Sequence, residues 1–496
     1  MCYIPGDLGD SRFINYLLEH GYRYLSGKTP LFWQAPFMVP YHSSIALSDN
    51  MLGTLPIYSL FRWAGLGREN AYQSWWIIIT SLNYWICFAV LRKWVGSNLL
   101  ALCGAFVFAY GLFNLSQLNF MQMSCRFMIP PILFWAWRMV KEPKLKYLLW
   151  YALGLAYQFY CVLYLGFLLF YFSLLFIFFI ALFSRSFSFL TYYITRKRLV
   201  YTIGIAVLTA LPVYFLLTPY LVTARETGFR LYKEVVPNLP TLYSYIFSHE
   251  ASIPWHFLFE HGTRQFKEWW LQDIFPGLMV YAGFAMALFG IVRARLQKRK
   301  SDALLTALLV TSAMIFLFFT RFGEHLTLYG ALIKLPGMNS LRVLTRFMHV
   351  QSFFLILLGV YGLSRIPWKR KGLHQLIYFL LPLLVIADNL FDADKVVRTE
   401  KSTAIQRVEH LCTQVRKQEM TGYQALAYLP DGTEPVYITQ MDMMLAAQEL
   451  GIPTVNGYSS NCPPAFGNFF LKEDESSLRE WLLKTHTSFD QIRVVR

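Results

Sequence analysis

The stretch YLGFLLFYFSLLFIFFIALFS, residues 164–184, decides the fold class of this chain. It carries no charged side chain, and Arg185 follows it directly. About 20 consecutive apolar residues form a helix long enough to cross the hydrocarbon core of a bilayer. The stretch therefore predicts a membrane-spanning helix.

Similar apolar stretches lie on both sides of it. The set falls near 71–91, 99–113, 127–140, 147–162, 164–184, 199–219, 276–292, 303–320, 347–364 and 374–391. Several are short, and 147–162 runs into 164–184 with almost no polar break. The sequence predicts a mainly α, polytopic membrane helix bundle with about 10 spans.

Every second connection between these stretches is basic. The basic connections are Arg92-Lys93, 138–146, Arg185 with Arg196-Lys197-Arg198, 293–300, and Arg365 with Lys369-Arg370-Lys371. Lys and Arg concentrate in cytoplasmic loops of membrane proteins. We therefore expect these loops inside the cell, and the N-terminal segment, the other connections and the last hundred residues on the exported side.

An exported N-terminal segment needs a signal for its export. Residues 1–70 contain neither a long apolar run nor a signal peptide with a basic start and an apolar middle. We expect a first transmembrane helix to precede them, which gives 11 spans and a cytoplasmic N-terminus in the intact protein. The alternative is a segment translocated without such a signal.

Composition agrees with a membrane protein. The chain is 56% hydrophobic and only 15% charged, unlike an ordinary soluble domain. Its net charge of +16 would suit nucleic acid, but about 19 of the 45 Lys and Arg residues lie in the five basic connections. They indicate orientation signals and contacts with anionic membrane lipids, with no nucleic-acid partner.

Two cysteines, Cys412 and Cys462, fall in the C-terminal part that is expected to be exported. Because an exported compartment is oxidising, a disulfide between them is one expectation. The other cysteines show no paired spacing for zinc or haem.

Three segments outside the apolar stretches are too long to be simple connectors. The chain divides into an exported first loop with surface helices (1–70), a transmembrane bundle (71–391) that includes an exported loop (220–275), and a C-terminal domain (392–496). In the last of these, a helical 401–419, an apolar 423–429, a turn at Pro430-Asp431-Gly432, a strand-like 435–439 and a helical 441–450 predict a small exported α/β domain.

The first loop carries the densest chemistry. Asp7 and Asp10 lie three residues apart in a Gly-containing turn, directly before an amphipathic helical pattern that begins near Phe13. We expect that helix to lie on the membrane surface. Asp10 would cap its start, or one of the two carboxylates would act as a general base close to the bilayer. Asp49, later in the loop, is either a turn residue or a substrate contact.

Several motifs resemble a known family. They are Gly6-Asp7-Leu8-Gly9-Asp10-Ser11-Arg12-Phe13, Leu18-Glu19-His20-Gly21-Tyr22-Arg23, Phe32-Trp33-Gln34-Ala35-Pro36-Phe37, Ser48-Asp49-Asn50, Gln122 with Arg126-Phe127, Gln158 with Tyr164-Leu165-Gly166, Phe275-Pro276-Gly277, Leu335-Pro336-Gly337, Leu341-Arg342-Val343 with Arg346-Phe347, and Asn456-Gly457-Tyr458-Ser459. Together they span most of the chain, which resembles bacterial integral-membrane proteins of the GT-C glycosyltransferase superfamily.

The resemblance implies about a dozen helices in the bacterial inner (plasma) membrane, a catalytic acidic residue in the first exported loop and a polyprenyl-phosphate-linked sugar donor. The acceptor would be an envelope glycan, lipid or protein, and the configuration at the sugar would be inverted. Asp10 or Asp7 is the expected base. An anionic donor needs exported cations near helix ends, so Arg12, Arg126, Arg321, Arg342 and Arg346, with Asp49, are the expected substrate-binding residues. The chain departs from the family by lacking the first span.

No cofactor is expected. The pairs His249-Glu250 and Glu260-His261 would suggest a divalent metal, but the i, i+4 pairing of a metalloprotease helix is absent. Two other functions remain open: a transporter or flippase of lipid-linked sugars, and a non-catalytic envelope assembly protein. Transporters usually carry ionisable residues within their spans and internal repeats, whereas these apolar stretches are almost free of charge.

Overall fold

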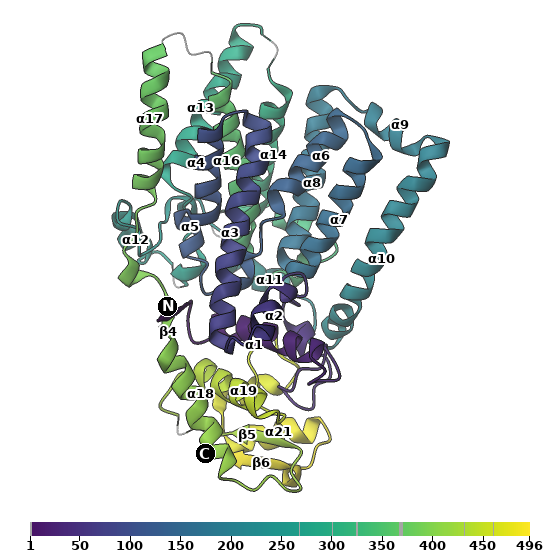
Figure 1. Ribbon diagram of the computed structural model, residues 1–496, viewed down its shortest axis with the longest axis vertical. Coiled ribbons are helices and arrows are strands. Elements are labelled where there is room, and N and C mark those ends of the chain that lie inside the picture. Colours follow the sequence, from purple (N-terminus) through teal and green to yellow (C-terminus); the bar gives the residue numbers. More distant parts are fainter. Residues whose placement is uncertain are drawn as a thin grey trace.

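A computed structural model describes residues 2–266, 268–299, 301–323, 326–366, 371–430, 432–459 and 461–496. Figure 1 shows an upright helix bundle with a smaller, mixed unit at one end. The N-terminal segment lies between the bundle and this unit. The prediction of a mainly α protein is confirmed.

Each of the ten apolar stretches lies on a helix. The bundle helices are α3 (Arg68–Val95), α4 (Asn98–Tyr110), α5 (Leu112–Leu115), α6 (Ile129–Lys141), α7 (Leu145–Cys161), α8 (Leu163–Ser184), α9 (Ser188–Ile194), α10 (Arg196–Thr227), α13 (Leu278–Leu296), α14 (Ala303–Phe319), α16 (Met348–Ser364) and α17 (Lys371–Asp388). Polar caps mark several starts: Ser97 Oγ accepts the amide of Leu100, and Asp302 Oδ1 accepts that of Leu304.

Six segments in the described part of the chain are long and apolar enough to cross a membrane. They are Arg68–Val95, Asn98–Leu115, Leu163–Ser184, Arg196–Thr227, Leu278–Leu296 and Leu344–Ser364. Ala303–Phe319 and Tyr378–Asp388 are apolar but shorter, and α6, with 13 residues, would rise only about 20 Å. The structure thus supports six spans by length and composition.

Helix α16 forms the centre of the bundle and α10 its edge. In the α16 span 83% of the residues in the apolar window are buried inside the protein, against 11% in α10. Gly283 of α13 faces Gly359 of α16 so closely that a Cβ on Gly283 would lie 2.9 Å from the other Cα. Small residues allow this close approach, which is a common way for membrane helices to pack.

The basic connections gather at the end of the bundle away from the mixed unit (Figure 1). There, Arg365 donates to the hydroxyl of Tyr361, which donates to Asp302 at the start of α14. Tyr193 of α9 donates to the carbonyl of Lys144 between α6 and α7. The predicted basic residues Lys300, Lys369 and Arg370 lie outside the described residues. The basic residues on which the topology prediction depends therefore lie together at one end of the bundle.

The N-terminal segment contains β1 (Tyr3–Pro5), α1 (Asp10–Leu25) and α2 (Leu55–Trp63). The expectation that α1 lies on the membrane surface is wrong. Its residues from Ser11 to Tyr22 are all buried, because α2 and α3 cover one side and α19 (Val436–Leu450) covers another. The polar side of α1 faces polar partners in the protein instead of water.

Two ion pairs satisfy that polar side. Arg12 donates from Nη1 to Asp442 Oδ1 of α19 at 2.6 Å. Glu19 accepts from Arg62 of α2 at 2.8 Å and from the hydroxyl of Tyr58 at 2.8 Å. Buried charges are tolerated only when they are paired and hydrogen-bonded. These contacts therefore fix α1 in its place.

The C-terminal unit contains β4 (Arg398–Glu400), α18 (Lys401–Arg416), β5 (Ala425–Tyr428), α19, α20 (Phe466–Lys472), α21 (Glu475–Lys484) and β6 (Ile492–Val495). Strands β5 and β6 pair in parallel, and β4 pairs antiparallel with β1 of the N-terminal segment. The predicted mixture of helix and strand is present. The predicted strand 435–439 is wrong: Pro435 sets the start of α19, which already includes Thr439. Asp431, in the predicted turn, lies outside the described residues.

The loop 220–275 contains the end of α10, α11 (Tyr232–Val235) and α12 (His256–Gly262). Asp388, the last residue of α17, ties it to the bundle. The Asp388 carboxylate accepts the Trp255 indole N–H at 3.0 Å and the amides of Leu278 and Met279 at 2.9 Å. The strands β2 (Arg321–Phe322) and β3 (Leu326–Thr327) and the short helix α15 (Tyr329–Leu332) complete this end of the bundle.

The expected disulfide is absent from the structure, in which Cys412 and Cys462 are both free. Cys412 is buried on α18, where its thiol donates to the carbonyl of Ala446 at 3.8 Å. Cys462 donates to the carbonyl of Ser459 at 3.3 Å. The two thiols lie against different elements of the C-terminal unit. Sharing one compartment is therefore not enough to bring them together as a disulfide.

The two ends of the bundle are expected to face opposite sides of the membrane. In a background with Cys2 and Cys462 replaced by Ser, an impermeant thiol reagent added to intact cells should label Thr433→Cys and leave Ser301→Cys unlabelled. Both positions should react after the cells are opened. Labelling of Ser301→Cys alone in intact cells would show that the orientation is the opposite of the expected one.

The Arg12–Asp442 pair is expected to matter strongly for stability. Asp442→Asn leaves a buried guanidinium without its charge partner, which typically costs about 3–5 kcal/mol, so the thermal midpoint in detergent should fall clearly. Glu480→Gln, which breaks an exposed pair with Lys484, should leave the midpoint almost unchanged. The double variant Arg12→Met with Asp442→Leu should recover part of the loss, whereas no recovery would contradict this account.

Candidate functional site

Asp7 and Asp10 lie together at the start of α1, but they have different roles. Asp7 Oδ1 accepts the backbone amides of Gly9 and Ser11, each at 3.2 Å. These are amides at the first turn of the helix without a backbone acceptor in the described part of the chain, so Asp7 supplies the capping carboxylate, a role that the sequence left as one alternative for Asp10. Burial and the charge of Asp10 raise the pKa of Asp7 to about 6.

Asp10 is half-buried and accepts the hydroxyl of Tyr458 at 2.6 Å. Among the residues that the structure describes, no other hydrogen bond reaches its side chain. Burial raises the pKa of Asp10, and the Tyr458 hydroxyl and the positive charges of Arg346 and Arg342 offset part of that rise. Burial also raises the pKa of Tyr458, and the Asp10 carboxylate raises it further, so Tyr458 stays protonated as the donor.

Gly9 allows the C-terminal unit to approach these carboxylates. A Cβ at this position would lie 2.8 Å from the ring of Tyr437 in α19. Contacts below 3 Å essentially do not occur for real Cβ atoms, so a larger residue would push α19 away from the start of α1. The close packing of α19 thus explains why a glycine lies between the two aspartates.

Arg346 lies over two aromatic rings near the N-terminus of α16. Its guanidinium carbon is 4.4 Å from the ring centre of Phe120 and 5.2 Å from that of Tyr164. Its Nε is buried and has no acceptor within the described part of the chain. Arg342, four residues earlier in the sequence, is exposed. One arginine is thus held by rings, and the other reaches solvent.

Asp49 lies within electrostatic reach of Arg346. Its Oδ1 accepts the amide of Leu163, the first residue of α8, at 2.9 Å. Burial raises the pKa of Asp49 to about 6, while the Leu163 amide and the positive charge of Arg346 act in the opposite direction. We call Asp7, Asp10, Asp49, Arg342 and Arg346 the acid–arginine cluster.

Three of the expected substrate-binding residues lie outside this cluster. Arg12 is occupied by Asp442. Arg126 is buried, where it donates to the carbonyls of Phe108 at 3.1 Å and Ala109 at 3.3 Å at the end of α4. Arg321 lies on β2, where its backbone amide donates to Pro240. Arg12 and Arg126 therefore have structural partners inside the fold.

The sequence did not single out Tyr458 or Phe120 for a role. Tyr458 stood only in the motif Asn456-Gly457-Tyr458-Ser459, and 448 residues separate it from Asp10. Its neighbour Asn456 binds the backbone of Tyr428 on β5, with the Tyr428 amide donating at 2.7 Å and the carbonyl accepting at 3.0 Å. No local pattern relates such distant positions, because only the packing of α1 against the C-terminal unit brings them together.

The described residues contain no group of three or more His, Cys, Asp or Glu side chains that could hold a metal ion. Of the residues that suggested one, His256 lies 3.6 Å from Glu260 on α12, and His249 accepts the amide of Ala251. The acid–arginine cluster offers carboxylates and guanidinium groups, and Tyr458 adds a hydroxyl beside Asp10.

Comparison with protein-family models and with curated proteins gives no match. The fold itself defines the class: a mainly helical protein whose apolar helices indicate a membrane protein.

The raised pKa of Asp49 predicts a pH-dependent cost to folding. A carboxyl whose pKa rises from 3.8 to about 6 on folding destabilises the fold progressively between those pH values, and fully above the higher one. Asp49→Asn keeps an oxygen for the Leu163 amide. It should therefore be more stable than the wild type at pH 7.5, by at most ~3 kcal/mol. This advantage should shrink at pH 4.5. Thermal unfolding at both pH values measures it, and an equal difference at both would contradict the assignment.

Proposed function

We propose that this chain is a membrane glycosyltransferase of the outer face of the bacterial plasma membrane. It would move a sugar from a polyprenyl-phosphate-linked donor to an envelope glycan, lipid or protein, with inversion of configuration. The single observation that carries this proposal is the half-buried Asp10, held by Tyr458 beside Arg346 and Arg342 at the end of an apolar bundle.

The two arginines suit the phosphate of the donor. A guanidinium binds phosphate oxygens through parallel N–H groups. Arg346 has a buried Nε without an acceptor among the described residues, and its plane is held by Phe120 and Tyr164. Arg342 is exposed and can meet an anion that arrives from the membrane surface. The donor phosphate would complete the hydrogen bonds of Arg346.

Asp10 is the better candidate for the base. The reaction forms a bond between the acceptor oxygen and the anomeric carbon and breaks the bond from that carbon to the phosphate oxygen. The lipid phosphate leaves with the electron pair, and a carboxylate takes the proton of the acceptor hydroxyl. Asp7 already accepts two helix amides, whereas Tyr458 binds only one oxygen of Asp10. A raised pKa makes Asp10 a stronger base while ionised.

Asp49 would hold Arg346 in place before the donor binds. Its carboxylate is fixed by the Leu163 amide and lies within electrostatic reach of Arg346. A phosphate that binds Arg346 adds negative charge beside Asp49, which favours protonation of that carboxyl. Asp49 is therefore a positioning residue in this proposal.

The proposed orientation follows from the ends of the bundle. With all ten apolar helices as spans, the basic connections face the cytoplasm and the acid–arginine cluster faces the outside. The C-terminal unit would then be an exported domain that covers the site. A donor whose lipid tail stays in the bilayer would present its phosphate at this level.

Transfer of a radiolabelled sugar from a panel of polyprenyl-phosphate sugars tests the proposal. Asp10→Asn should lower turnover about 10²-fold or more, because it keeps the size of the side chain but cannot take the proton. Asp7→Asn should have a small effect, since an amide oxygen can still cap α1. Asp490→Asn, an exposed carboxylate of the C-terminal unit, is the matched control.

Arg346→Lys should act on donor binding rather than on the chemical step. A point charge replaces a planar fork, so the KM for the donor should rise more than kcat falls. Full activity of both Asp7→Asn and Asp10→Asn would remove the catalytic role of this pair and leave Asp49 as the next carboxylate to examine. Movement of the lipid-linked sugar across vesicles without transfer would instead favour a flippase.

A further inference from the structure

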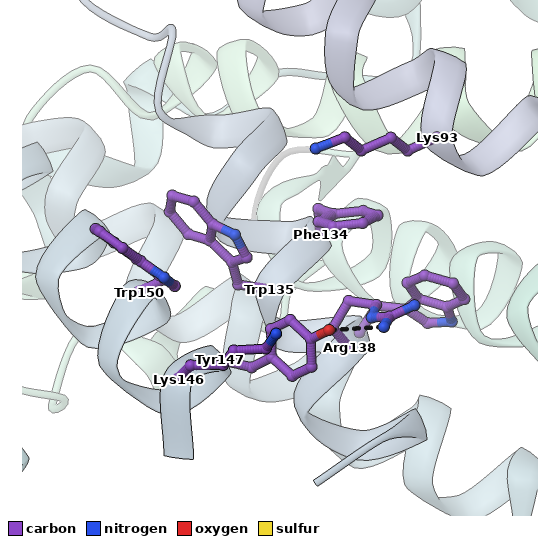
Figure 2. A pocket seen from close by; sticks show the side chains of 8 residues that line it. Lys93, Phe134, Trp135, Arg138, Lys146, Tyr147 and Trp150 are labelled. Carbon is purple, nitrogen blue, oxygen red and sulfur yellow. Dashed lines mark hydrogen bonds between the residues drawn. The ribbon is translucent and has the colours of Figure 1, made fainter. Parts of the chain in front are cut away.

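A second polar site lies at the opposite end of the bundle, where α3, α6 and α7 meet. A hollow of about 430 Å³ is lined there by three cations, Lys93, Arg138 and Lys146, and by aromatic rings. Figure 2 shows the side chains that line it. Lys93 lies in the last turn of α3, about 30 Å along the helix from Tyr72, whose hydroxyl donates to the carbonyl of Ser11 at the start of α1. We call this site the basic hollow.

The cations of the basic hollow have few partners in the protein. Within the described part of the chain, neither Lys93 nor Lys146 forms an ion pair; each ammonium only lies near an aromatic ring, Phe134 at 5.7 Å and Tyr147 at 5.2 Å. Arg138 donates to Glu142 and to the hydroxyl of Tyr147. No acidic residue lines the hollow. Glu142 pairs with Arg138 from outside the lining, so among the described residues the unpaired positive charge of the site is that of Lys93 and Lys146.

Aromatic rings form the rest of the wall. Trp135 and Trp150 stack with their ring centres 6.0 Å apart, and Figure 2 shows them as neighbours. Half of the surface of Trp150 is exposed. Trp and Tyr collect where a bilayer meets water, because one part of the ring system is apolar and the other can donate a hydrogen bond.

An apolar groove adjoins the basic hollow. It lies between α7 and α10, has a volume of about 510 Å³, and shares Lys146 with the hollow. Leu149, Leu208 and Ile205 are among its walls, and Gly204 of α10 leaves it open, since a Cβ there would meet nothing within 4 Å. The cationic hollow and the apolar groove are therefore neighbours that share one wall residue, Lys146.

We propose that this composite site binds one anionic phospholipid. The head-group phosphate would lie in the basic hollow between Lys93, Lys146 and Arg138, and an acyl chain would lie in the groove between α7 and α10. Basic pockets between membrane helices near the water interface suit such head groups. The charge favours a lipid with a net negative head group, because the ammonium of a zwitterionic lipid would meet three cations.

Native mass spectrometry of the delipidated full chain in detergent tests this proposal. Added phosphatidylglycerol should remain bound as a discrete first adduct, whereas phosphatidylcholine at the same concentration should not. The double variant Lys93→Gln with Lys146→Gln should weaken phosphatidylglycerol binding about tenfold or more. Gly204→Phe fills the groove without changing the charge and should also weaken it. Glycerol 3-phosphate, which has the phosphate but no acyl chain, should bind much more weakly than the lipid.

Arg92→Gln with Lys141→Gln is the matched control, because these exposed cations lie at the same end and do not line the hollow. If this control loses as much phosphatidylglycerol binding as the lysine variant, the lipid is held only by general electrostatic attraction, and the proposed site is overturned. Equal retention of the two lipids, or binding of glycerol 3-phosphate as tight as that of the lipid, would also overturn it. Thermal midpoints within a few degrees of the wild type would confirm that the variants fold.

Discussion

The rest of the structure depends on the buried ion pair between Arg12 of α1 and Asp442 of α19. Asp442 also accepts Arg407 of α18 at 2.7 Å, so one carboxylate joins the N-terminal helix to two helices of the C-terminal unit. Taking these charges out of water is expensive, and only their mutual contact compensates for it. The helix α1 therefore cannot leave α19 without exposing or orphaning a charge, and the chain ends are held together.

The acid–arginine cluster is a consequence of this arrangement. Asp10 is at the start of α1 and Tyr458 is in the C-terminal unit, so their hydrogen bond exists only while α1 stays docked. Burial beside α19 raises the pKa of Asp7 to about 6, and burial at the start of α8 raises that of Asp49 to about 6 as well. The fold thus accepts a cost in stability near neutral pH in order to hold carboxylates beside arginines, as sites that use charge often do.

The bundle has two chemically different ends. One has carboxylates and arginines under a folded unit, and the other has cations and aromatic rings with little acid around them. Lipids with phosphate head groups suit both ends, but for different reasons. At the first end a reactive phosphate would meet arginines next to a candidate base. At the second a resident lipid would meet two lysines that form no ion pair in the described part of the chain, because the nearby Glu142 is already bound to Arg138 and Lys144. This difference gives the two ends different proposed roles, turnover at one and anchoring at the other.

The sequence by itself determined the helices, because long apolar runs can satisfy their backbone only internally and need no distant partner to be recognised. It also determined where the basic connections lie and that Asp7, Asp10, Asp49, Arg342 and Arg346 deserve notice. Only the tertiary structure decided that Asp7 is the cap, that Arg12 and Arg126 have structural partners, and that α1 is buried rather than on a surface. The Asp7 cap and the Arg126 contacts are near in sequence but depend on the exact backbone geometry of their turns. The burial of α1 and the Arg12–Asp442 pair depend on residues hundreds of positions apart, and a local pattern of side chains contains no information about which distant surface will cover it.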